Sequence, residues 1–175
     1  MDSLPHNSLA LQGLGLSWGS VHWNQPRFPT LDERAALLGD RLPHWAIASG
    51  TTAGWVWTGM GYPEPWSVLR PTQPAVSPLQ RTLWSARERN PLHHSIVRLS
   101  GLEVLTPEST AREVLLSSEP TDSRAAQLWV LEELCERPLE SLVGERRSAK
   151  IDRENATHAL EALEQLHQHY PDITR

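Results

Sequence analysis

The chain has 175 residues, a length that suits a single domain, and it carries a formal net charge of −5 at pH 7. That charge argues against a protein whose main activity is to coat a polyanion, because such binding depends on an excess of lysine and arginine. Cys135 is the only cysteine, so a disulfide framework is excluded and a reducing cytoplasm is expected. We also expect no membrane contact, since no apolar run approaches the length of a membrane span.

Residues 1–29 are predicted to form an N-terminal extension that is too short to fold alone. Within it, the alternating stretch 16–23 (LSWGSVHW) predicts a strand or half of a hairpin. A capping-box pattern follows at Thr30 and Glu33 and predicts a helix that runs to about Leu42.

A stretch rich in glycine and tryptophan, SGTTAGWVWTGMG at 49–61, follows a predicted buried strand at 45–49. It is not a P-loop, because that loop needs a lysine directly after its last glycine and the only lysine here is Lys150. The glycine spacing of a Rossmann fingerprint is absent as well. We therefore interpret the stretch as a packing element.

The packing element is expected to be a short helix over 51–58. Ser49 is its predicted N-cap, and Gly54 would let a neighbouring element approach closely. Gly59 or Gly61 would supply a left-handed exit from the helix.

Two tryptophans, Trp55 and Trp57, lie on this predicted helix. Their side chains would point about 200° apart around a helix axis, so we expect one of them to leave the core. We take Trp55 as the inward residue and Trp57 as an exposed aromatic, the residue type most enriched at binding hot spots.

The rest of the chain divides into strands followed by helices. Strands are predicted at 66–69, 94–99 and 102–106, and helices at 109–117, 122–137, 139–146 and 153–170. The predicted fold class is α+β, with a small mixed sheet in the first half packed against a helical C-terminal half.

Two segments resemble the C-terminal domain of AbiEi-type antitoxins, which belong to bacterial type IV toxin-antitoxin systems. Residues 43–59 (PHWAIASGTTAGWVWTG) are similar to the family's strand that ends in serine and to the short helix after it. Residues 101–115 (GLEVLTPESTAREVL) look like the family's strand-turn-helix signature, "glpVtsPeRTllDL". The resemblance extends over roughly 30–165, so we take 30–175 as a domain of this type.

The second segment matches the signature at Thr106, Pro107 and Thr110 but departs from it at two other positions. Ser109 replaces the family's arginine, and Glu113 stands where the family has aspartate. Any salt bridge that those two family residues make is therefore expected to be absent or rerouted in this chain.

A larger departure lies at the front of the chain. Relatives carry an N-terminal winged helix-turn-helix, and 29 residues cannot hold three helices and a wing. The stretch 16–23 is at most a remnant of the wing hairpin. We therefore expect only weak, non-specific binding of duplex DNA.

The sequence offers little support for an enzyme, a cofactor or a metal site. His93 and His94 are adjacent on a predicted strand, so their side chains would point to opposite faces and could not share a metal ion. A restriction-type nuclease would want a carboxylate two residues before Lys150, and Ser148 occupies that position.

A basic cluster near the C-terminus is a candidate docking patch for nucleic acid or an acidic partner. If the chain is helical there, its members fall on one side of the helix: Arg146, Arg147, Lys150 and Arg153. The alternative is an ordinary solvated helix face, because acidic residues are interspersed with the basic ones.

These observations favour a non-catalytic protein that acts by binding. The resemblance implies an antitoxin or transcriptional regulator of the AbiEi type, whose partner would be a nucleotidyltransferase-like toxin. The alternative is a stand-alone protein-interaction module without a toxin, and a metal-dependent nuclease is the third hypothesis.

Overall fold

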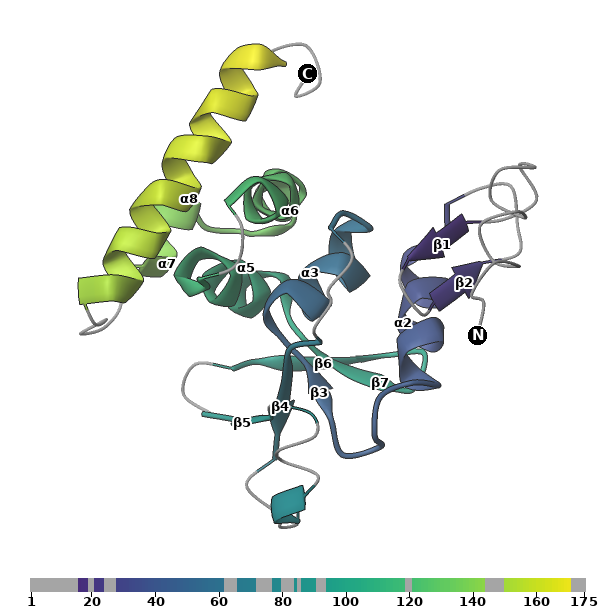
Figure 1. The fold of residues 1–175 in the computed structure, drawn as a ribbon. Coiled ribbons are helices and arrows are strands. Elements are labelled where there is room, and N and C mark those ends of the chain that lie inside the picture. Colours follow the sequence, from purple (N-terminus) through teal and green to yellow (C-terminus); the bar gives the residue numbers. More distant parts are fainter. Residues whose placement is uncertain are drawn as a thin grey trace, which may run out of the picture.

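The computed structural model describes most of the chain, and its placed residues are 16–18, 21–23, 28–61, 66–71, 77–79, 84, 86–90, 94–118, 121–143 and 150–170. Its architecture is α+β, as predicted, with a five-stranded mixed sheet built from the first half and helices in the second (Figure 1). No helix among these residues is both long enough and apolar enough to cross a membrane.

The strands of the main sheet are short. They are β3 (Ile47–Ala48), β4 (Val68–Arg70), β5 (Arg87–Glu88), β6 (Ile96–Leu99) and β7 (Leu102–Leu105), in the spatial order β5-β4-β3-β7-β6. The β3/β7 and β4/β5 pairs are parallel, whereas β3/β4 and β6/β7 are antiparallel. The sheet is therefore mixed. Strand β5 has no counterpart among the predicted elements.

A separate antiparallel hairpin is formed by β1 (Leu16–Trp18) and β2 (Val21–Trp23), with Leu16 opposite Trp23. The stretch 16–23 therefore contains both strands of the pair, where the sequence predicted a single strand or half of a hairpin.

Helix α2 (Leu31–Gly39) begins at the predicted capping box. The Thr30 backbone N–H donates to a Glu33 carboxylate oxygen at 2.8 Å, and the Glu33 N–H donates to Thr30 Oγ1 at 3.4 Å. Each group satisfies a donor that a helix start leaves free.

Helix α3 (Gly50–Thr58) follows β3 directly and lies over the sheet. The Arg34 guanidinium of α2 binds the C-terminal end of α3, donating to Val56 O at 2.7 Å and to Trp57 O at 3.0 Å. Because the last carbonyls of a helix carry partial negative charge and lack helical partners, a cationic donor stabilises them.

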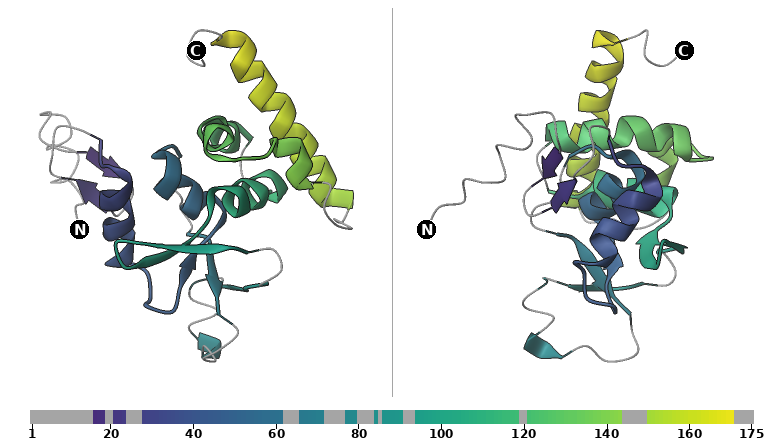
Figure 2. Two further views of the ribbon diagram at one scale, coloured as in Figure 1. Left: turned by 180° about the vertical axis from the view of Figure 1, so that it is seen from behind. Right: turned by 90° about the vertical axis from the view of Figure 1, so that its right-hand side faces the viewer.

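The second half of the chain forms α5 (Pro107–Leu116), α6 (Thr121–Leu134), α7 (Leu139–Val143) and α8 (Lys150–His169). Both views of Figure 2 agree with Figure 1 that α3 and α5 lie on one side of the sheet, with α6 and α8 farther from it. The predicted helix 139–146 corresponds to α7, whose end falls at Val143, and residues 144–149 lie outside the described part.

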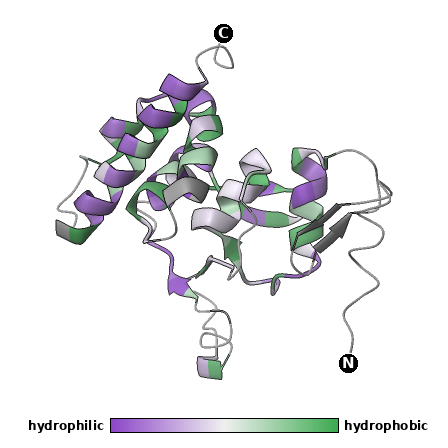
Figure 3. Cartoon of the chain, turned by 45° about the horizontal axis from the view of Figure 1, so that its top comes forward, coloured by the Kyte–Doolittle hydropathy of each residue, from purple (hydrophilic) through white to green (hydrophobic). Residues whose placement is uncertain are grey.

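The described residues form two hydrophobic core clusters. One cluster contains buried residues of the sheet, α2 and α3, among them Trp55 and Ile47. The other contains buried residues of α5 to α8, among them Leu128 and Leu131. Hydrophilic residues recur along α8 (Figure 3), while Ala156, Ala159 and Leu163 of that helix are buried in the second cluster. Helix α3 packs against both α5 and α6 and so joins the two clusters.

Candidate functional site

The stretch 49–61 is occupied by packing and by internal hydrogen bonds. Gly54 faces the buried side chain of Gln127 from α6, and a Cβ atom placed on Gly54 would lie 2.2 Å from Gln127 Oε1. A glycine is therefore required for α3 and α6 to approach this closely. Gly59 ends the helix with φ = 72°, in the left-handed region, and its N–H donates to Trp55 O at 2.8 Å.

Gln127 holds the two ends of this stretch together. Its Nε2 donates to Thr51 O at 3.1 Å, to Met60 O at 3.0 Å and to Gly61 O at 3.2 Å. Carbonyl groups that could have faced a ligand are thus used within the fold. Sequence reasoning missed Gln127, because a single glutamine inside an apolar helical stretch has no motif to mark it.

Ser49 does stand at the N-cap of α3, but its side chain makes no capping hydrogen bond. Its Oγ is buried and has no hydrogen-bond partner among the described residues. The backbone carbonyl of Ser49 accepts from Ala53 N–H at 3.1 Å, so the helix begins without help from the hydroxyl.

Trp55 is fully buried, as the helical spacing predicts. Trp57, which we expected to be an exposed aromatic, is instead only partly exposed and packs against both hydrophobic clusters. Its indole N–H donates to Leu105 O at 2.8 Å. The expectation fails because α3 is covered on more than one side: the sheet cluster takes Trp55, and Trp57 fills the space toward the later helices.

The second motif, at the junction of β7 and α5, is also engaged internally. Pro107 is the first residue of α5, where a missing N–H costs nothing. Thr110 Oγ1 donates to Leu105 O at 3.1 Å. Thr106 Oγ1 donates to Ser109 Oγ at 3.2 Å, and that oxygen accepts from the Ser95 N–H at 3.0 Å. Ser109 thus fastens the helix start to the segment that leads into β6.

Glu113 makes the rerouted ion pair. Its carboxylate accepts from the Arg87 guanidinium, and its Oε1 lies 3.0 Å from His94 Nε2. The Asn90 N–H donates to His94 Nδ1 at 3.0 Å, so Nδ1 is the acceptor and Nε2 carries the proton that faces Glu113. Burial would raise the pKa of Glu113, but the hydrogen bond from His94 and the charge of Arg87 outweigh it, and the net result is a lowered pKa.

Both ring nitrogens of His94 are therefore used, and Glu113 is held by two partners. This geometry fixes α5 to β5 and to the start of β6.

The predicted basic patch cannot be assembled from the described residues. Arg146 and Arg147 lie outside the described part, and the side chain of Lys150 is not described although the residue begins α8. Arg153 is exposed on α8.

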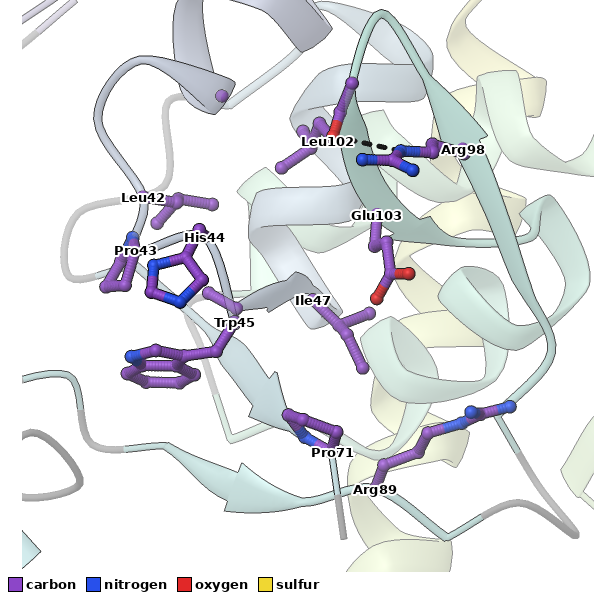
Figure 4. A pocket seen from close by; sticks show the side chains of 13 residues that line it. Leu42, Pro43, His44, Trp45, Ile47, Pro71, Arg89, Arg98, Leu102 and Glu103 are labelled. Carbon is purple, nitrogen blue, oxygen red and sulfur yellow. Dashed lines mark hydrogen bonds between the residues drawn. The ribbon is translucent and has the colours of Figure 1, made fainter. Parts of the chain in front are cut away.

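A polar pocket of about 400 Å³ lies on the sheet at the start of β7 (Figure 4). We call it the charged pocket, and the side chains that define it are His44, Trp45, Ile47, Arg89, Arg98 and Glu103. Leu42, Pro43, Pro71 and Leu102 add apolar surface to its wall.

The strand register explains why these side chains meet. Ile47, Glu103 and Arg98 are paired across β3, β7 and β6, so their side chains share one face of the sheet. Val104 and Ala48 are offset by one residue and face the opposite side, where they are fully buried. The helices cover that second face, and they lie behind the strands in Figure 4.

The sequence analysis did not single out the charged pocket, because its members come from separate segments. The loop before β3 contributes His44 and Trp45, and Arg89 is the residue that directly follows β5. Part of the pocket could have been predicted from Arg98 and Glu103, since each is an exposed, charged residue on one of two adjacent strands.

Within the part of the chain that the structure describes, no three histidine, cysteine, aspartate or glutamate side chains gather as a metal site would need. Comparisons of the chain with models of known families, with curated proteins and with solved structures find no match.

Proposed function

We propose that this chain is a non-catalytic binding protein of the AbiEi antitoxin type, which acts in the cytoplasm by binding a protein partner. The proposal rests on the hydrogen bonds made in and around the two segments that resemble the family, 43–59 and 101–115. The Trp57 N–H, the Thr110 hydroxyl and the Gln127 amide all bond to backbone carbonyls of these segments. Their polar chemistry serves packing, which leaves the surface to carry the function.

The charged pocket supports binding as the mode of action. It is open at the sheet surface and is lined by side chains of both charge signs, and the described residues around it place no nucleophile in contact with a base. A binding surface of this kind suits a protein partner, because mixed charges give specificity by complementarity.

The partner that the resemblance suggests is a nucleotidyltransferase-like toxin. A gene for such a protein directly downstream would favour the antitoxin hypothesis, and an isolated gene would favour the stand-alone interaction module. The direct test expresses the nucleotidyltransferase-like protein alone and together with this chain, and measures growth and the elution volume of the mixture in size-exclusion chromatography.

We expect the chain to restore growth and to elute with the toxin as one complex. A control chain with the Trp55→Ala substitution, which removes a fully buried indole, should fail to do either because it is poorly folded. If the folded parent neither restores growth nor forms a complex, the antitoxin hypothesis is wrong.

A further inference from the structure

Among the described residues, the charged side chains of the charged pocket lack the ion pairs that other charged side chains on the sheet make. On the same sheet, Arg70 pairs with Glu88 at 2.8 Å and Arg87 pairs with Glu113. In contrast, none of Arg89, Arg98 and Glu103 has an ion-pair partner among the residues described, although all three line one pocket.

The missing pair between Arg98 and Glu103 is informative because the two residues are direct cross-strand neighbours. Opposite charges in that position normally attract one another. Here the Arg98 Nε donates to Gly101 O at 3.4 Å instead, while Arg89 donates to His94 O at 3.2 and 3.3 Å. Both guanidinium groups are thus held by backbone carbonyls, and within the described part of the chain no carboxylate neutralises their charge.

The order of the charges is visible in Figure 4. Arg98 stands at one end of the pocket, Arg89 at the other, and the Glu103 carboxylate lies between them. Leu42, Pro43 and Ile47 provide an apolar wall beside this row. The surface therefore alternates positive, negative and positive.

We propose that the charged pocket binds an extended segment of the protein partner in which two acidic side chains flank a basic one. The acidic groups would pair with Arg98 and Arg89, and the basic group would pair with Glu103. In an extended chain, alternate residues point to the same side, so the matching pattern is acidic-x-basic-x-acidic, in which the residues at x face away from the pocket. This inference rests on the proposed function, because it names the chemistry of the partner.

A nucleic acid fits the pocket less well. Glu103 stands between the two arginines and would repel a phosphate backbone, in which every unit is negative. The chain's net charge of −5 adds to that repulsion. A peptide with alternating charge satisfies all three side chains at once.

The test uses three synthetic probes and the full chain labelled with ¹⁵N. The first probe is the blocked peptide Gly-Asp-Val-Lys-Val-Asp-Gly, the second is its charge-reversed form, Gly-Lys-Val-Asp-Val-Lys-Gly, and the third is an oligothymidylate. Each probe is titrated to millimolar concentration while amide resonances are followed by NMR.

We expect the first peptide to shift the resonances of Ile47, Arg98 and Glu103, and to bind at least about tenfold more tightly than either other probe. Arg98→Glu should weaken its binding about tenfold or more. Arg98 is exposed and makes one long hydrogen bond, so this variant should fold. Arg153→Glu makes the same charge change on α8 and should leave binding unaltered.

The proposal is overturned if the first peptide leaves these resonances unshifted, or if the charge-reversed peptide or the oligothymidylate binds the pocket equally well. It is also overturned if Arg153→Glu weakens binding while Arg98→Glu does not, because the α8 surface would then be the docking site.

The peptide titration and the toxin experiment can fail independently of one another. If a toxin complex forms and survives Arg98→Glu, the antitoxin hypothesis stands and the pocket is not its binding site. If the peptide binds the pocket and no toxin complex forms, the pocket stands and the partner is a different protein.

Discussion

Glu113 is a largely buried carboxylate held between Arg87 and His94, and its lowered pKa links its charge to stability. A carboxyl group with a lower pKa in the folded state adds stability above its usual pKa of 4.5, and that stability is lost as the pH falls through the folded value. Glu113→Gln should therefore lower the free energy of unfolding at pH 7 by about 2 kcal/mol. The difference from the parent should shrink as the pH falls below 4.5.

Urea denaturation of both proteins between pH 7 and pH 3 measures this difference. Glu108→Gln is the matched control, because Glu108 lies on the same helix and its ion pair with Arg137 is far more exposed. That control should cost less than about 1 kcal/mol. A Glu113→Gln variant as stable as the parent at pH 7 would contradict a structural role for the cluster.

Cys135 is the second residue whose chemistry the fold alters. Burial, together with the nearby carboxylates of Glu108 and Glu132, raises the pKa of its thiol to about 11. Since the thiolate is the reactive form, alkylation by iodoacetamide at pH 7 should be about a hundredfold slower than for an ordinary cysteine. Mass spectrometry of the alkylated chain measures the rate, and the urea-unfolded chain is the control. Equal rates in the native and unfolded chains would contradict this shielding.

At the level of elements, the contact between α3 and α6 depends on one glycine. Gly54→Ala would place a Cβ atom 2.2 Å from Gln127 Oε1, and Gln127 cannot yield easily because its amide nitrogen is held within hydrogen-bond distance of three carbonyl oxygens. We expect a loss of about 1–3 kcal/mol in the free energy of unfolding. Gly39→Ala is the control, because its Cβ would meet Leu102 at an ordinary 3.9 Å.

A double-mutant cycle identifies the cause of that loss. In a Gln127→Ala background the clash disappears, so Gly54→Ala should cost clearly less there than in the parent. If its cost is the same in both backgrounds, the loss comes from the backbone of α3 and not from contact with Gln127.

Helices and strands were predictable from the sequence where they are long or strongly periodic. Helix α8 and the capping box of α2 were predictable because their signals are local. Strand β5 was not, since it consists of Arg87 and Glu88, two exposed charged residues without alternation. Helix α5 begins at Pro107, two residues before the predicted start, because proline is well accommodated in a first turn.

The candidate site was harder to predict, because short stretches of sequence contain little information about which distant residues meet there. The close approach at Gly54 could be inferred from the glycine itself, but its partner Gln127 lies 73 positions away and carries no motif. The charged pocket depends on strand register between β3, β7 and β6, which is decided by tertiary packing. The two-residue spacing correctly places Trp55 and Trp57 on different sides of α3. The exposure of Trp57 could not be predicted in the same way, because it depends on which other elements cover its side of the helix.

At the scale of the whole molecule, the two hydrophobic clusters are joined through α3, and Trp57 contacts both. We therefore expect the parent to unfold in one transition, with the same midpoint by tryptophan fluorescence and by far-ultraviolet circular dichroism. Trp57→Ala would open a cavity between the clusters and remove the donor to Leu105 O. The indole is partly exposed, so we expect a loss near the lower end of about 3–5 kcal/mol.

Trp57→Phe separates packing from hydrogen bonding. Leu105 O keeps the hydroxyl of Thr110 as a donor, so losing the indole N–H should cost only about 1 kcal/mol. Urea unfolding of the parent and both variants, followed by the two spectroscopic probes, measures these costs. If Trp57→Ala unfolds like the parent, or if the parent itself shows two midpoints, then Trp57 does not couple the sheet to the helical half.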